Sequence, residues 1–158
     1  MPPARKLGIV AVALALGVVG FGLGLASATS GITNPVTITV IEHATHDKIT
    51  DVGKKGDSAG DIFTYHNDLY DSTDTTKVGG DNGMCVRESP KAGTWECWWT
   101  TTLADGQITA EGPYSDTAPT DTYAVTGGTG LYENVRGSMV ETYDAATGEF
   151  TLVYSLIP

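Results

Sequence analysis

Beyond residue 35 the chain consists of short stretches rich in Thr, Val, Tyr, Ile and Trp, and a cluster of Gly, Pro, Asp or Asn follows each stretch. No segment in this part keeps the 3.6-residue apolar spacing of an amphipathic helix over several turns. This spacing predicts antiparallel β-strands joined by turns, with the polar segment 45–60 as the longest loop. The expected strands cover residues 36–43, 61–70, 83–89, 94–102, 107–112, 120–126, 136–143 and 149–156.

About eight sequential strands in so short a chain favour closure into a barrel, because a closed sheet has no exposed edge strand. The predicted fold class is therefore all-β: an eight-stranded antiparallel up-and-down barrel, preceded by an N-terminal signal helix. A β-sandwich is the alternative. A barrel of eight strands has room inside for side chains or for one small ligand.

The N-terminus has the features of an export signal. Arg5 and Lys6 precede an apolar run over residues 7–25, and Ala26-Ser27-Ala28 supplies the small residues that signal peptidase accepts. We predict a signal peptide over residues 1–28 and one domain over 29–158, in a secreted, periplasmic or extracellular protein. The alternative for the apolar run is a retained membrane anchor, because its length approaches that of a spanning helix.

Charge restricts the partners of the exported domain. The chain has nineteen acidic and nine basic residues, and two of the basic ones lie within residues 1–28, which leaves a net charge of −12 (7 − 19). Nucleic acids and anionic membrane surfaces would repel such a domain. The expected partner is an apolar small molecule, neutral or cationic, with no nucleic acid and no membrane partner after cleavage.

The two cysteines, Cys85 and Cys97, lie on either side of the turn 89–93. Pairing Glu88 with Thr94 across this turn places the two cysteines opposite each other, and an oxidising compartment favours a disulfide between such residues. The alternative is two free thiols, one of them functional.

Alternation in the first expected strand places Glu42 on the same face as Ile38 and Val40. If this face points inward, burial would raise the pKa of Glu42, which could then act as a proton donor or as a local negative charge. If Glu42 instead reaches water at the strand end, it has no such role. On another strand, Trp95, Cys97 and Trp99 share one face, for cavity lining or core packing, and Trp98 lies on the other.

Other kinds of site have little support in the sequence. His43, His46 and Asp47 form a metal-like cluster, but a strand would place the two histidines on opposite faces. No G-x-S-x-G motif of a serine hydrolase occurs. We therefore predict no metal and no cofactor.

Several short motifs together resemble the allene oxide cyclase and dirigent protein family. Gly127-Gly128-Thr129-Gly130, then Tyr132 and Arg136-Gly137, are similar to the signature that the two groups share. We interpret these glycines as a tight strand crossing and not as a phosphate loop, because no helix follows. The order and spacing of further motifs are closer to allene oxide cyclase: Val40-Ile41-Glu42, Asn67-Asp68-Leu69-Tyr70, Gly83-Met84-Cys85-Val86 and Glu111-Gly112-Pro113-Tyr114.

The resemblance implies a barrel with an apolar cavity that folds a reactive fatty-acid epoxide for ring closure, and it raises the possibility of a homotrimer. By motif position it implies catalytic roles for Glu42, Asn67 and Tyr114. We expect four residues to contact the substrate: Cys85, Trp95, Trp99 and Pro113. Ala44 stands where the cyclase has a second asparagine, and a bridged Cys85 could not serve as a free cavity thiol.

Three functions remain open on these grounds. The first is a cyclase or isomerase that confines a reactive apolar substrate. The second is a dirigent-like guide for a coupling reaction whose radicals another enzyme makes. The third is a non-catalytic carrier of a hydrophobic metabolite.

Overall fold

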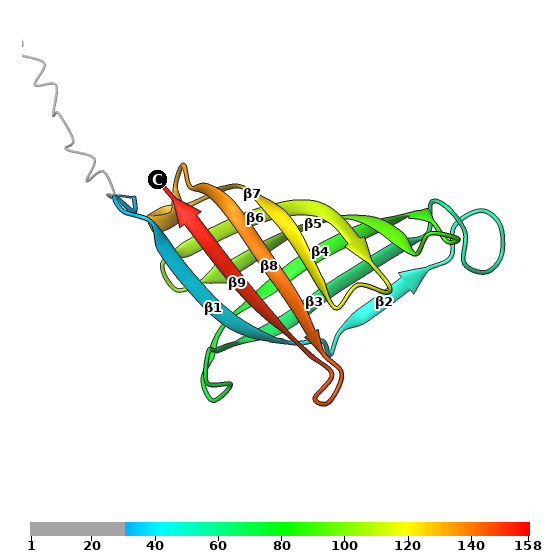
Figure 1. The fold of residues 1–158 in the computed structure, drawn as a ribbon, viewed down its shortest axis with the longest axis horizontal. Helices are drawn as coiled ribbons and strands as arrows, with labels where there is room; N and C mark the ends of the chain where they lie inside the picture. Colours follow the sequence, from blue (N-terminus) through cyan, green and yellow to red (C-terminus); the bar gives the residue numbers. More distant parts are fainter. Residues whose placement is uncertain (1–30) are drawn as a thin grey trace, which may run out of the picture.

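The computed structural model describes residues 31–158, in which nine β-strands and one 3₁₀ helix are found (Figure 1). The signal peptide expected over residues 1–28 lies outside the described residues. No helix of the described part has the length and apolar character needed to cross a membrane. The elements are β1 (Val36–His43), β2 (Asp47–Thr50), β3 (Ile62–Asp71), β4 (Lys77–Ser89), β5 (Thr94–Leu103), β6 (Gly106–Ser115), β7 (Thr120–Gly128), η1 (Gly130–Tyr132), β8 (Arg136–Asp144) and β9 (Glu149–Ile157).

The strands form one antiparallel sheet that closes on itself. Its order is β1-β9-β8-β7-β6-β5-β4-β3, and β3 pairs back with β1, with Glu42 opposite Leu69. β2 pairs with the first half of β3, so β1 and β2 together occupy a single position in the barrel. The prediction of an eight-stranded up-and-down barrel is confirmed.

Two parts of the chain differ from the sequence prediction. Residues 47–50, expected in a loop, form β2, and β4 begins at Lys77 and not at residue 83. Cys85 pairs with Cys97 as expected, but Thr94 pairs with Ser89, so Glu88 is the extra residue of a β-bulge.

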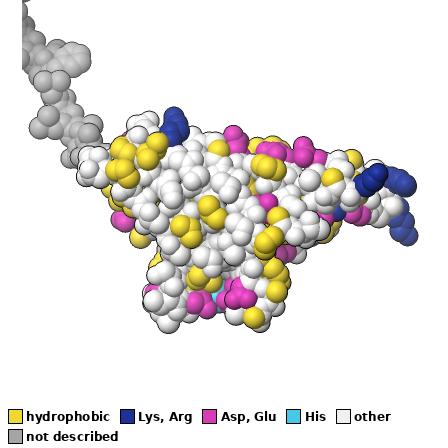
Figure 2. Space-filling view, in the orientation of Figure 1, with side chains coloured by type: hydrophobic (Ala, Val, Ile, Leu, Met, Phe, Trp, Pro, Cys, Tyr) yellow, Lys and Arg dark blue, Asp and Glu magenta, His cyan; other side chains and the backbone are white. Residues whose placement is uncertain are grey.

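The barrel is packed at one end and hollow toward the other. Side chains that alternate inward fill the packed part, with Leu69, Ile108, Met139 and Leu156 almost fully buried. η1 closes this end with the buried Tyr132, and Ile32 donates a backbone hydrogen bond to the carbonyl of Leu131. On the outer surface, acidic side chains are spread over the face shown in Figure 2, while Lys and Arg gather at its two ends.

The glycines of the shared signature lie where backbones approach closely. A Cβ atom on Gly128 would collide with the carbonyl oxygen of Gln107 and lie 2.5 Å from that of Tyr132. Gly130 has a φ of 63°, in the left-handed region that favours glycine. Gly128 itself does not have a positive φ, so lack of space is the reason for glycine at this position.

Cys85 and Cys97 form a disulfide across the β4–β5 hairpin, and the predicted bridge is confirmed. The sulfur atoms lie on the inner face of the barrel, where both cysteines line the cavity described below. A bridge of this kind is typical of exported proteins.

We expect the replacement of both cysteines by alanine to lower the free energy of unfolding by about 2–3 kcal/mol, because the bridge restricts the unfolded chain. Chemical denaturation of the oxidised protein and of the Cys85→Ala/Cys97→Ala double variant would measure the difference. Equal midpoints in the two unfolding curves would contradict a stabilising role for the bridge.

Candidate active site in the barrel cavity

The hollow end of the barrel holds a cavity of about 210 Å³. It opens into a wider mouth that is bounded by the β6–β7 turn and the β8–β9 hairpin, and Tyr114, Glu141 and Phe150 belong to both. The cavity is lined by Glu42, Ala44, Asp47, Phe63, Tyr65, Asn67, Cys85, Cys97, Trp99, Tyr114, Tyr123, Glu141 and Phe150. None of these lining residues, all within residues 31–158, is Lys, Arg or His.

Glu42 lies at the inner end of the apolar row of β1, and its side chain is only 6% exposed. The amide nitrogen of Asn67 donates a hydrogen bond of 2.7 Å to its carboxyl group and one of 3.1 Å to Asp47. The amide oxygen of Asn67 accepts from the backbone N–H groups of Thr45 and His46, both at 3.0 Å. These two donors fix the orientation of the amide group, so that its nitrogen must face the two carboxyl groups.

The same contacts explain the break between β1 and β2. Residues 44–46 leave the sheet, and the backbone N–H groups of Thr45 and His46 bond to the Asn67 side chain instead of to a neighbouring strand. Asn67 therefore shapes the chain at the cavity and orients Glu42 with one side chain.

Burial raises the pKa of Glu42 well above its ordinary value, and the nearby negative charge of Asp81 adds to this effect. The hydrogen bond from Asn67 acts in the opposite direction but does not cancel it. Glu42 therefore holds its proton to higher pH than an exposed glutamate does.

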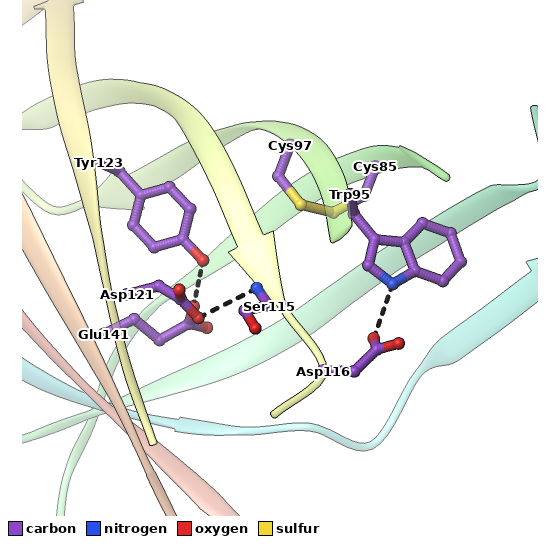
Figure 3. Close-up of a disulfide and its surroundings, with 8 residues drawn as sticks. All are labelled: Cys85, Trp95, Cys97, Ser115, Asp116, Asp121, Tyr123 and Glu141. Atoms are coloured by element: carbon purple, nitrogen blue, oxygen red, sulfur yellow. Dashed lines mark hydrogen bonds between the residues drawn. A yellow bond between two sulfur atoms is a disulfide. The ribbon is translucent and has the colours of Figure 1, made fainter. Parts of the chain in front are cut away.

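A second carboxyl group, Glu141 on β8, lies at the border between cavity and mouth. It accepts a hydrogen bond of 2.5 Å from the hydroxyl of Tyr123, which points toward it in Figure 3. Burial raises the pKa of Glu141 to about 7, and the negative charge of Asp121 adds to the shift.

A third carboxyl group, Asp81 on β4, is buried beside these two, with 2% of its surface exposed. Its Oδ1 atom has no hydrogen-bond partner among the described residues. Burial raises the pKa of Asp81 to about 7, against the effect of a hydrogen bond from the backbone of Asn67.

Aromatic side chains form most of the remaining wall. The rings of Trp99 and Tyr123 meet edge to face with their centres 4.3 Å apart. Tyr65 lies against Gly83, where a Cβ atom would collide with its ring and hydroxyl. Burial raises the pKa of Tyr114 to about 12, and burial also raises that of Tyr65, so both hydroxyls stay protonated and can donate hydrogen bonds.

Arg87 marks the boundary of the site on the side of loop 51–60. Its guanidinium group is ion-paired with Asp57 at 2.7 Å and with Asp116 at 2.6 Å, and it lies 4.5 Å from the ring centre of Trp95. The indole N–H of Trp95 donates to Asp116 as well (Figure 3). The charge of Arg87 is thus neutralised by groups outside the cavity lining.

The structure brings most of the residues expected from the sequence to one place. Glu42, Asn67, Tyr114, Cys85, Cys97 and Trp99 line the cavity. Trp95 is buried but packs between Phe63 and Arg87 outside the lining. Pro113, also expected to contact the substrate, lies outside the lining and is exposed on the outer face, because Gly112 and Tyr114 take the inward positions of β6.

Sequence reasoning did not single out Tyr65, Asp81 and Glu141 as site residues. Residues two apart in a strand point the same way. Tyr65 could therefore have been found from Asn67, and Glu141 from the apolar Met139. Asp81 lay in a segment that was not expected to form a strand.

The metal cluster considered from the sequence does not form. His46 packs against His66, with ring centres 4.4 Å apart, and takes no part with His43 in a common cluster. Within residues 31–158 the group close enough to share an ion is His43, Asp74 and Glu149 on the outer surface. There the Nε2 atom of His43 is already 2.7 Å from Asp74 and 3.3 Å from Glu149.

The family model described as the allene oxide cyclase barrel-like domain matches residues 39–151, from the middle of β1 to the start of β9. The chain belongs to this family. The expected resemblance is thereby confirmed, and the match includes every strand that contributes a carboxyl group to the cavity. No curated protein shows a significant match to the chain.

Three solved structures show how the same barrel is used elsewhere. A pyocyanin demethylase shares 29% sequence identity and a TM-score of 0.69, over 77% of this chain and 100% of its own. An exo-specific intermolecular Diels–Alderase shares 20% identity and a TM-score of 0.63, over 77% and 97%. A pterocarpan synthase dirigent protein shares 15% identity and a TM-score of 0.63, over 77% and 82%. The last two likenesses concern the fold alone.

Proposed function

We propose that this protein is an enzyme that binds one flat, conjugated and largely apolar small molecule in the barrel cavity and transforms it by acid–base catalysis at Glu42. The observation that carries the proposal is the carboxyl group of Glu42, buried in an aromatic cavity and oriented by Asn67 at 2.7 Å. A carrier of an apolar metabolite would gain nothing from such a group, because burying a carboxyl costs free energy of folding.

The raised pKa of Glu42 suits it to donate a proton, at a pH where an exposed glutamate is already ionised, to a carbonyl oxygen or a ring nitrogen of the substrate. After the transfer, its carboxylate opposes the positive charge that develops on the conjugated system. The hydroxyls of Tyr65 and Tyr114 supply hydrogen bonds to a developing oxyanion.

The reaction class that needs the fewest additional components is cyclisation or isomerisation. Such a reaction adds and removes no atoms, so a proton donor and a cavity that confines the substrate in a reactive conformation are sufficient. This fits a cavity that is lined by carboxyl groups, by the amide of Asn67 and by tyrosine hydroxyls.

The charge of the cavity argues for a ring compound and against a fatty-acid epoxide. A fatty-acid chain would bring its own carboxylate to a site that already contains Glu42, Asp47 and Glu141 and has no cationic lining residue. The carboxylate of a fatty acid would be repelled by negatively charged groups in the same cavity, and this repulsion opposes its binding. The flat aromatic walls instead match the faces and edges of a conjugated ring.

A second candidate reaction is removal of an N-methyl group from such a ring, which the 29% identity to a pyocyanin demethylase favours. Loss of the methyl group as formaldehyde consumes one water molecule and leaves two electrons and two protons with the ring. A ring that can accept two electrons would therefore need no separate oxidant.

Mass spectrometry can distinguish these functions. The protein purified from its own host would be analysed under native conditions for a bound metabolite, and the purified protein would be incubated with pyocyanin. We expect either an isomer of equal mass from the bound metabolite or formaldehyde with a demethylated ring from pyocyanin. A metabolite that is bound and released unchanged over many cycles would contradict an enzymatic role.

A further inference from the structure

Two carboxyl groups, Glu42 and Glu141, line the cavity, and a third, Asp81, is buried outside the lining opposite Asn67, whose amide bonds to Glu42. Glu42 comes from β1, Asp81 from β4 and Glu141 from β8. Negative charge on Asp81 and on Glu141 raises the pKa of Glu42, and charge on Glu141 raises that of Asp81. The three groups are therefore close enough to interact, and they repel one another when ionised.

The described residues offer no positive charge to balance this cluster. The cavity lining contains no Lys, Arg or His. The two basic residues of β4 are already paired elsewhere, Lys77 with Asp68 at 2.7 Å and Arg87 with Asp57 and Asp116. The Oδ1 atom of Asp81, shielded from solvent, has no hydrogen-bond partner within residues 31–158. Buried carboxyl groups normally have a cation or several donors. The lining acids Glu42 and Glu141 have hydrogen bonds from Asn67 and Tyr123 but no cation, and a ligand could provide that positive charge.

The walls around the carboxyl groups are the kind that attract cations. Six aromatic residues line the cavity: Phe63, Tyr65, Trp99, Tyr114, Tyr123 and Phe150. Aromatic faces attract a positive charge, most strongly where water is excluded, and aromatic cages bind quaternary nitrogen in this way. A delocalised cation can satisfy aromatic walls and carboxylates together, because its charge is spread over a flat apolar surface.

We infer that the substrate or ligand of this cavity carries a delocalised positive charge, as a quaternised or protonated nitrogen heteroaromatic does, and that Glu141 and Asp81 serve as its counter-ions while Glu42 remains the proton donor. The inference rests on the proposed function and names the substrate class for the same cavity. It assigns Asp81 a part in binding through the electric field of the cluster, without direct contact with the ligand.

A cation and a neutral ligand should respond to pH in opposite directions. A bound cation favours the ionised carboxyl groups, so its binding releases protons and its affinity increases as the pH rises. A neutral ring that accepts a hydrogen bond needs a protonated carboxyl group, so its affinity decreases over the same range.

These effects involve the titratable groups that face the cluster from the surrounding strands. They are Asp47 of β2, Tyr65 of β3, Tyr114 of β6, Tyr123 and Asp121 of β7, and Tyr154 of β9, while β5 contributes the uncharged Trp99 and Thr101. Burial raises the pKa of each of the four tyrosines, so these groups stay neutral between pH 6 and 8. Over this range the carboxyl groups change the charge of the cavity.

Phenazine and N-methylphenazinium provide a matched pair for the test, because they share one three-ring skeleton and differ in a methyl group and its positive charge. Isothermal titration calorimetry at pH 6 and pH 8 would give both affinities, and two buffers of different ionisation enthalpy would give the protons released. We expect N-methylphenazinium to bind about tenfold more tightly at pH 8 than at pH 6, with proton release, and phenazine to bind no more tightly at pH 8.

Variants separate the cavity from the acidic surface. Glu141→Gln should weaken N-methylphenazinium binding about tenfold at pH 8 and leave phenazine binding unchanged. The matched control Glu111→Gln removes the same charge from the exposed outer face of β6 and should change neither affinity. Excess phenazine should displace the bound cation if both occupy the cavity.

The outcomes distinguish failure of this inference from failure of the proposed function. Tight binding of phenazine with weak or pH-independent binding of the cation would overturn the inference and leave the proposed function intact. Binding of neither compound would contradict a cavity for flat conjugated rings, and the inference would fall with it. Equal loss of cation affinity in Glu141→Gln and Glu111→Gln would assign the binding to general surface charge and overturn the inference.

Discussion

Glu42→Gln is expected to lower kcat about 10²–10⁴-fold, the usual contribution of a positioned general acid, while the fold and ligand binding are retained. The glutamine has nearly the volume of the glutamate and can still accept the hydrogen bond from Asn67 through its amide oxygen. It has no proton to donate to the substrate and no negative charge to oppose a developing cation. The measurement is steady-state turnover of whichever compound the conversion assay identifies, with dissociation constants measured in parallel.

The pH profile tests the same assignment independently of the size of the loss. If protonated Glu42 is the acid, kcat of the unmodified enzyme should decline as the pH rises through the raised pKa of this residue. Glu42→Gln should lack this decline, and the surface control Glu111→Gln should retain it. Unchanged turnover in Glu42→Gln would assign the function to cavity shape alone.

Most strands could be predicted because their inward side chains are apolar and alternate with polar ones. In β5, for example, Trp95, Cys97 and Trp99 are buried, while Trp98 is 41% exposed on the outer face. β2 shows no such signal, because all four of its residues are exposed and their order comes from pairing with β3. A strand without a buried face has no period-two pattern to detect.

The start of β4 was missed for a different reason. Residues 79–82, Gly-Gly-Asp-Asn, have the composition of a turn, yet they continue the strand through the barrel wall. Gly79 is required there because a Cβ atom would collide with the carbonyl oxygen of Thr102. Asp81, Gly83 and Cys85 are two residues apart in β4, so all three face inward. This alternation can be recognised only once the register of the folded sheet shows that residues 79–82 belong to the strand.

The candidate site was partly predictable because the family motifs indicated which residues belong to the site, whereas alternation along a single strand could not decide this. Alternation in β1 left Glu42 either buried or in water, and the motif order favoured a site role for it. Pro113 shows the limit of this reasoning, since a motif identifies a segment, whereas the strand register decides which of its side chains point inward. Contacts such as Tyr123 with Glu141 depend on pairing between distant strands.

The buried carboxyl groups should also make the protein most stable in mildly acidic solution. A carboxyl group whose pKa is higher in the folded than in the unfolded state stabilises the fold below the unfolded value of about 4, and this stability is lost as the pH rises through the folded value. Asp81 and Glu141, both with a pKa of about 7, and Glu42 belong to this class. Asp71 has the opposite shift, because hydrogen bonds from Thr75 and Thr73 lower its pKa, so stability should also fall in strong acid. We expect the melting temperature to be highest near pH 4–5 and to decrease toward pH 8.

Asp81→Asn should remove part of this decrease, raising the free energy of unfolding by about 2 kcal/mol at pH 8 and by almost nothing at pH 4. The asparagine keeps one oxygen for the hydrogen bond from the backbone of Asn67, and its uncharged amide replaces the oxygen that has no partner. Asp105→Asn, in the exposed β5–β6 turn, removes the same charge from the surface and controls for the net charge of the chain. Urea denaturation of the three proteins at both pH values would measure the effect. An equal loss of stability in Asp81→Asn at pH 4 and pH 8 would show that ionisation of Asp81 does not destabilise the fold. The decrease in stability with rising pH would then have to come from Glu42 and Glu141 alone.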